Sequence, residues 1–272
     1  GLDAIERSIV RDVPEDLHTA WSPQDAVSSA KRSRRLILDM ALIRAIDALD
    51  VYLREAIRKP AIIQSDVFRR GLDEANQSIF KKMLVVERNC PDLDKLPLAI
   101  IFLMIAWRNR SAHSEADCDA PQRHLDVISA EAEELQIRFR GLDAERLLDG
   151  YVSTRSAKFK EVASLINAVH HLVADLDYRL LVALDIESFV RDTIWSSLGA
   201  NPRPTEIIDQ TRMRRAVNVW GKDPSDRGGA IIRLLKQHGF STTAPKERAV
   251  VEVPANLFKK LEDLTPRSVV EW

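Results

Sequence analysis

The chain has 272 residues, 45% of them hydrophobic and 30% charged, and its formal net charge is −1. This composition is ordinary for a soluble globular protein, and the length allows one large domain or two smaller ones. A net charge near zero excludes a global field that would attract nucleic acid, so any such contact must come from local clusters. The two cysteines, Cys90 and Cys118, exclude a disulfide framework, and they predict a reducing, cytoplasmic location. No apolar run reaches membrane-spanning length, so no membrane contact is expected.

The N-terminal part of the chain predicts long helices joined by short connections. Apolar residues follow a helical period from Ser22-Pro23, a good N-cap with proline at the first helical position, to Lys59-Pro60. We expect further helices over residues 65–87, 96–113 and 121–139, with a turn over 89–94. Four such helices predict an antiparallel helical bundle over residues 1–152, and therefore a mainly α, all-α fold.

The C-terminal part, residues 153–272, predicts a second helical module that contains one β-hairpin. Helices are expected over residues 158–184, 186–198, 205–220, 225–238 and 255–264. Between the last two, apolar residues at 240–243 and 249–253 flank a polar turn, which is typical of a hairpin. A helix, a hairpin and another helix in this order resemble a winged-helix arrangement, which uses its exposed surface on nucleic acid or on a partner protein.

One cluster, Trp107-Arg108-Asn109-Arg110-Ser111-Ala112-His113, carries most of the functional information. It follows an apolar run that begins at Leu96. The planar guanidinium of an arginine can bind two phosphate oxygens, and a histidine can move protons near neutral pH. At about 100° per residue, Arg108 and His113 would lie about 140° apart on an ideal helix. The two can therefore act on one phosphate only if the helix ends within the cluster or a second copy completes the site.

The pattern Arg108-Asn109-x-x-x-His113 resembles the signature of the HEPN superfamily, whose arginine, polar residue and histidine form a metal-independent ribonuclease site. The family allows four to six residues between the arginine and the histidine, and two other pairs in this chain also fit that range: Arg11…His18 with six and Arg233…His238 with four. Only the Arg108 cluster has an asparagine after the arginine and an apolar helix before it. The upstream segment 48–53 also looks like the acidic helix of that family.

The resemblance implies a cofactor-free endoribonuclease that works as a homodimer with a composite active site, with Arg108, Asn109 and His113 as its catalytic residues. His113 would act on the ribose 2′-hydroxyl, Arg108 would stabilise phosphoryl charge, and Arg110 would bind flanking phosphate. Asp50, or Asp47 one turn earlier, would orient the cluster from a facing helix, and a structural ion pair is an equally good role for both. The family also implies a bacterial toxin or antiphage-defence effector, with a regulatory protein or antitoxin as a partner.

A second hypothesis is a non-catalytic helical dimer that binds nucleic acid or a protein through its C-terminal module. The candidate nucleic-acid-binding residues are Lys31, Arg34, Arg35, Arg233, Lys236, Lys246 and Arg248, although a solvated helix face or a charged packing module would explain them as well. His171 and Asp175 lie one helical turn apart, but two ligands are too few for zinc. We therefore expect them to serve helix packing or the surface.

Overall fold

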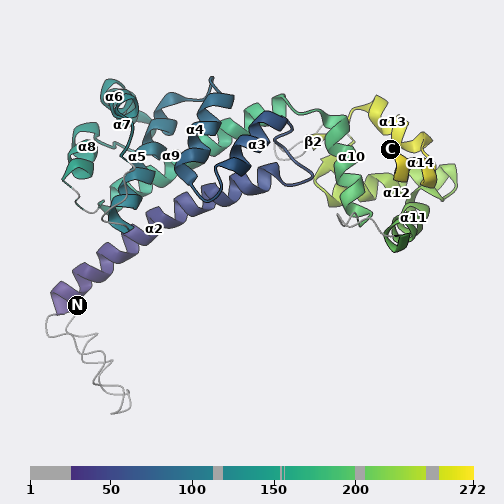
Figure 1. Cartoon of the computed structure of the whole chain (residues 1–272), viewed down its shortest axis with the longest axis horizontal. Coiled ribbons are helices and arrows are strands. Elements are labelled where there is room, and N and C mark those ends of the chain that lie inside the picture. The colour runs from purple at the N-terminus through teal and green to yellow at the C-terminus, as the bar shows by residue number, and fades with distance from the viewer. Residues whose placement is uncertain (1–25, 113–118, 154, 156, 200–205, 243–250) are drawn as a thin grey trace, which may run out of the picture. The chain divides into compact units, whose positions relative to one another are not determined.

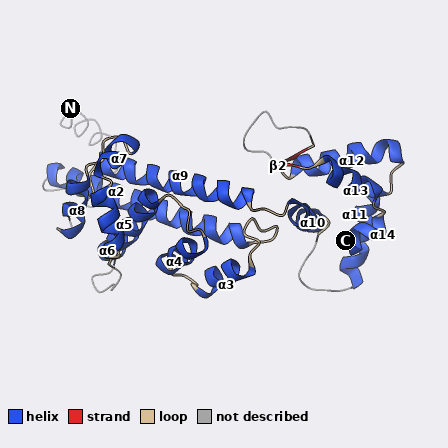
Figure 2. Ribbon diagram, turned by 90° about the horizontal axis from the view of Figure 1, so that it is seen from above, coloured by secondary structure: helices blue, strands red, loops and turns tan. Residues whose placement is uncertain are grey.

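The computed structural model describes residues 26–112, 119–153, 155, 157–199, 206–242 and 251–272 (Figure 1). These residues form 13 helices and one two-stranded sheet, so the predicted all-α class is confirmed (Figure 2). The helices are α2 (Ala26–Ile57), α3 (Asp66–Glu74), α4 (Ile79–Asn89), α5 (Lys95–Ala112), α6 (Gln122–Ala130), α7 (Ala132–Arg138), α8 (Ala144–Val152), α9 (Phe159–Val182), α10 (Ile186–Ser197), α11 (Glu206–Trp220), α12 (Pro224–Gln237), α13 (Ala255–Asp263) and α14 (Pro266–Glu271).

The described residues group into two compact units by their spatial contacts. Unit 1 combines residues 26–46 with 99–169, and unit 2 combines 47–98 with 170–272. The chain passes from one unit to the other inside α2, α5 and α9, so each unit is built from segments far apart in the sequence. The division into domains after residue 152 stays a prediction.

The core of unit 1 is built on the apolar half of α5. Every residue from Ala99 to Trp107 is at most 5% exposed. The ring of Phe102 stacks on that of His124 from α6, with centroids 4.2 Å apart, and Figures 1 and 2 both place α6–α8 around this helix. The apolar part of α5 is too short to cross a bilayer. No other helix in the described ranges is both long and apolar enough to do so. The expectation of a core helix here is confirmed.

Two of the predicted long helices are each divided in two. The helix expected over 65–87 is interrupted after α3 at Ala75, where Asn76 adopts a left-handed conformation with φ 51°. Ser78 then caps α4 by accepting a hydrogen bond from the Lys81 N–H, because serine favours the N-cap over the helix interior. Gly71 allows α3 to pack closely on α4, since a Cβ there would lie 2.9 Å from Val85 Cγ1. The helix expected over 121–139 is likewise broken at Glu131.

A partly buried ion pair links the connection after α8 to the first turn of α9 in unit 1. The Arg155 guanidinium donates to both carboxylate oxygens of Glu161, at 2.6 and 2.8 Å, and the Lys158 N–H donates to the same carboxylate at 2.7 Å. Burial alone would raise the pKa of Glu161, but these hydrogen bonds outweigh it and hold the pKa below its ordinary value of 4.5.

This lowered pKa predicts a pH-dependent contribution to stability. Because the carboxyl titrates at lower pH in the folded chain, its stabilisation is fully present above about pH 4.5 and is lost as the pH falls through the folded-state pKa. We expect the difference in unfolding free energy between the wild type and Glu161→Gln to be largest at neutral pH and to shrink in acid. Urea unfolding over a pH series measures it. A difference that stays constant down to about pH 3 would contradict the assignment.

The helices after α9 close around a separate apolar cluster in unit 2. Trp220, Ile231, Phe240 and Leu261 are among its buried members. The two-residue strand β1 (Phe240–Ser241) lies beside α12, and the two-residue strand β2 (Val251–Glu252) pairs with β1. A further short helix, α14, was not predicted from the sequence pattern.

The two strands do not form the predicted hairpin. They pair in parallel, with Phe240 opposite Val251, and the Val253 N–H donates to the Ser241 carbonyl at 2.7 Å. The expected hairpin is therefore corrected to a parallel pair. An alternation of apolar residues predicts that a segment is a strand, but it carries no information on the direction in which the strand pairs.

Candidate functional site

The structure places residues 107–112 of the Arg108 cluster in the last turns of α5, directly after the buried part of this helix. Arg108 and Asn109 are half-buried in the last turns of α5, directly after the fully packed Trp107. Arg110 belongs to the same helix, which is described as far as Ala112. His113 is the next residue in the chain and lies outside the described residues. The convergence of Arg108 and His113 on one phosphate therefore stays a prediction.

Tyr151, from α8, links the chain on both sides of residues 113–118. Its ring packs edge-on against Trp107, with centroids 6.4 Å apart. Its hydroxyl accepts a hydrogen bond from the Ala120 N–H at 3.0 Å and lies 3.4 Å from Asp119 Oδ1. The residue before Arg108 and the first residues described after His113 thus share one buried partner. Sequence reasoning missed Tyr151, because nothing in its neighbourhood distinguishes it from an ordinary core tyrosine.

Asp50 forms a structural ion pair in unit 2. Its Oδ1 lies 2.6 Å from Lys82 Nζ and its Oδ2 lies 3.3 Å from Arg54 Nε. The Lys82 side chain is only 4% exposed, so Asp50 neutralises a charge that is removed from water. These contacts support the structural role for Asp50. Asp47 is half-buried on the same helix, and a role of either aspartate in orienting Arg108 stays a prediction.

Removing the Asp50 carboxylate is expected to lower the free energy of unfolding by about 1–3 kcal/mol, because it leaves the Lys82 ammonium buried without its partner. The double variant Asp50→Ala/Lys82→Met is expected to be more stable than Asp50→Ala alone, since methionine carries no charge into the same space. Urea unfolding of the three proteins checks this. A double variant no more stable than the single one would show that the ion pair is not what Asp50 provides.

The predicted nucleic-acid-binding residues lie on exposed helix surfaces where they are described. Lys31, Arg34 and Arg35 project from the first half of α2, and Arg35 lies within 3.8 Å of Asp39. Arg233 and Lys236 are exposed and three positions apart on α12. Lys246 and Arg248 lie outside the described residues. The structure therefore brings Lys31, Arg34 and Arg35 together on α2, and it brings Arg233 and Lys236 together on α12.

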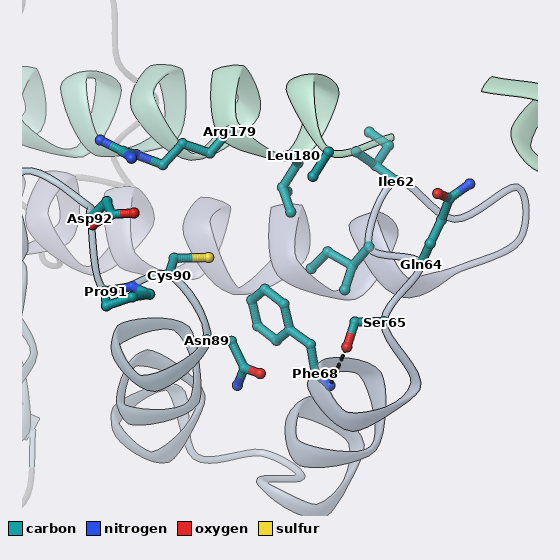
Figure 3. A pocket seen from close by; sticks show the side chains of 12 residues that line it. Ile62, Gln64, Ser65, Phe68, Asn89, Cys90, Pro91, Asp92, Arg179 and Leu180 are labelled. Carbon is teal, nitrogen blue, oxygen red and sulfur yellow. Dashed lines mark hydrogen bonds between the residues drawn. The ribbon is translucent and has the colours of Figure 1, made fainter. Parts of the chain in front are cut away.

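A pocket in unit 2 was not predicted from the sequence. It has a volume of about 320 Å³ and lies between the loop before α3, the turn between α4 and α5, and the last turn of α9 (Figure 3). Arg179, Cys90 and Asp92 are among its lining residues. These residues are far apart in the sequence and follow no motif spacing, so no sequence signal points to the pocket.

The paired histidines of α9 do not form a metal centre with their neighbours. Asp175, one turn after His171, binds Arg179 Nε with its Oδ1 at 3.0 Å and the Asp94 N–H with its Oδ2 at 3.0 Å. No group of three or more potential ligands that could hold a metal occurs within the described part of the chain.

Comparison with known proteins adds no family to this description. No protein-family model, no curated protein and no solved structure matches the chain.

Proposed function

We propose that the protein is an endoribonuclease whose active site is formed by Arg108, Asn109 and His113. The observation that supports this most is the position of Arg108 and Asn109, half-buried at the end of a helix whose preceding residues are fully packed. A rigid helix can hold a guanidinium in a fixed direction, which is what stabilising a developing phosphoryl charge requires. Charged and amide side chains that emerge directly from an apolar core are suited to a site rather than to a solvated surface.

The proposed reaction is a transesterification within the RNA. His113 takes the proton from the ribose 2′-hydroxyl or gives a proton to the leaving 5′-oxygen. The 2′-oxygen attacks the adjacent phosphorus, and the bond to the 5′-oxygen breaks. The products are a 2′,3′-cyclic phosphate and a free 5′-hydroxyl, while Arg108 stabilises the charge on the phosphoryl oxygens. Because the nucleophile comes from the substrate, the reaction needs no metal-bound water.

Two substrates of the same sequence test this chemistry. The purified protein is expected to cleave a labelled RNA in the presence of EDTA, and the product is expected to carry a 2′,3′-cyclic phosphate. An RNA with a single 2′-deoxy residue at the cleavage position is expected to remain intact at that position. Cleavage at the deoxy residue, or complete loss of activity in EDTA, would contradict the mechanism.

The proposal includes a homodimer in which each site takes residues from both copies. It is supported by the spacing of Arg108 and His113, which would point in different directions on one uninterrupted helix. If each site combines Arg108 of one copy with His113 of the other, a mixture of Arg108→Ala and His113→Ala proteins forms dimers with one intact site. The mixture is then expected to recover about one quarter of wild-type activity after subunit exchange. No recovery in mixed dimers would show that each copy supplies its own pair.

A non-catalytic alternative is favoured by the exposed Arg233 and Lys236 on α12. In this case the C-terminal module binds the backbone of a nucleic acid, or a partner protein, and the chain cleaves nothing. Binding of labelled RNA that weakens in Arg233→Ala/Lys236→Ala, without cleavage under any condition, would favour it.

A role of the proposed ribonuclease as a toxin or defence effector adds one expectation. Expression is then toxic to cells, and Arg108→Ala or His113→Ala removes the toxicity.

A further inference from the structure

The pocket in unit 2 has the size and shape of a site for a small molecule. Its volume of about 320 Å³ lies at the lower end of the range of about 300–1,000 Å³ for such sites. Segments from three different parts of the chain form its walls, so the pocket exists only in the folded protein (Figure 3).

The inner part of the pocket is apolar. Ile63 and Phe68 are at most 3% exposed, and Phe68 and Leu180 point into the space in Figure 3. The Cys90 thiol also points into the pocket. Burial raises the pKa of Cys90, and Arg179 opposes this shift only in part, so the sulfur is a neutral thiol at physiological pH. This part of the pocket therefore suits an apolar side chain.

Arg179 supplies a positive charge at one end of the pocket and is held in a fixed orientation. Its Nε donates to Asp175 Oδ1 at 3.0 Å, and Asp175 is itself held by the Asp94 N–H. No described residue accepts a hydrogen bond from the two terminal nitrogens of Arg179. These nitrogens have the fork geometry that binds a carboxylate through two parallel hydrogen bonds.

Asp92 supplies a negative charge at the same end (Figure 3). Its side chain is exposed and makes no hydrogen bond or ion pair with any described residue. The Asp175 carboxylate next to Arg179 adds a second negative charge, so a simple anion would be repelled as well as attracted. A ligand that carries both a carboxylate and an ammonium matches this arrangement of charges better than one that carries either alone.

We propose that this pocket binds a free α-amino acid with an apolar side chain, of the size of leucine or methionine. The carboxylate binds the terminal nitrogens of Arg179, the ammonium faces Asp92, and the side chain packs against Phe68 and Leu180. A residue within a peptide has lost one or both of these charges, so the pocket selects the free amino acid. This binding activity is separate from the proposed ribonuclease, whose Arg108 and Asn109 belong to unit 1.

Three ligands with nearly the same apolar part test the charge requirement. Calorimetric titration of the full chain with L-leucine is expected to show binding. Leucinamide lacks the carboxylate and 4-methylpentanoate lacks the ammonium, and each is expected to bind about tenfold more weakly or worse. L-Methionine is expected to bind, and L-glutamate is not. If neither leucine nor methionine binds at millimolar concentration, or if leucinamide binds as well as leucine, the proposal is wrong.

Variants of the pocket residues test where the ligand lies. Arg179→Gln is expected to weaken leucine binding by about 10- to 100-fold, and Asp92→Asn is expected to weaken leucine but not 4-methylpentanoate. Ala183→Phe adds a ring at the pocket wall from an exposed position, so it is expected to abolish binding while the unfolding midpoint changes little. Arg58→Gln, which changes an exposed arginine directly after the end of α2 and outside the pocket, is the matched control. Unchanged binding in both Arg179→Gln and Ala183→Phe would overturn the assignment.

Cys90 gives a second measurement that does not depend on the heat of binding. The chain has two cysteines, so Cys118→Ser leaves Cys90 as its single thiol. Leucine is expected to slow the alkylation of Cys90 in this variant and to have no effect once Arg179→Gln is added. Equal alkylation rates with and without leucine, in a protein that binds leucine by calorimetry, would place the ligand elsewhere.

Discussion

Replacing His113 by alanine is expected to lower the rate of RNA cleavage by about 100- to 10,000-fold, the usual contribution of a general acid or base. Arg108→Ala is expected to lower it by about 100- to 1,000-fold, because the phosphoryl oxygens lose their charged donor. Initial rates on a labelled RNA at saturating concentration measure both effects. Circular dichroism and the unfolding midpoint of each variant show whether the fold is retained.

The chain contains its own control for this prediction. His238 follows Arg233 at the same spacing as His113 follows Arg108, and it is exposed at the end of α12. His238→Ala is therefore expected to cleave RNA at the wild-type rate. Undiminished cleavage in His113→Ala, or an equal loss in His238→Ala, would remove the reason for placing the active site at the end of α5.

Trp220→Ala is expected to have the largest effect on stability, about 3–5 kcal/mol of unfolding free energy. Trp220 is fully buried in the C-terminal core, and its Nε1–H donates to the Leu261 carbonyl at 2.9 Å. Alanine would leave a cavity between α11 and α13 and would also leave that buried carbonyl without its donor. Urea unfolding followed by circular dichroism at 222 nm, the usual helix signal, measures the loss.

Trp220→Phe separates the two parts of this effect. Phenylalanine fills most of the volume but cannot donate a hydrogen bond, so we expect a loss of about 1–3 kcal/mol, smaller than that of alanine. Equal losses in the two variants would mean that the hydrogen bond, and not the packing, dominates. A wild-type midpoint in Trp220→Ala would contradict the description of this core.

The sequence predicted the part of the candidate ribonuclease site that lies on a single helix. The apolar run before Arg108 predicts a buried helix, and the structure places Arg108 and Asn109 where that helix leaves the core. Tyr151, which contacts the chain on both sides of the cluster, gave no signal. Its role depends on contacts with residues 107 and 120, more than thirty positions away, and no local pattern encodes such contacts.

The sequence by itself determined the all-α class, the buried helix from Leu96 to Trp107 and the position of Arg108 and Asn109 directly after it, because helical periodicity and apolar runs are local properties of the chain. The sequence did not predict the break at Asn76. A residue that adopts the left-handed conformation and a serine that caps the next helix favour a break over a continuous helix only weakly. Only the tertiary structure decided that Asp50 pairs with Lys82, that the two strands run in parallel, and that Arg179, Asp92 and Cys90 share one pocket. Each of these depends on segments brought together by folding, and the free energy of such contacts arises from burial and geometry that no single segment contains.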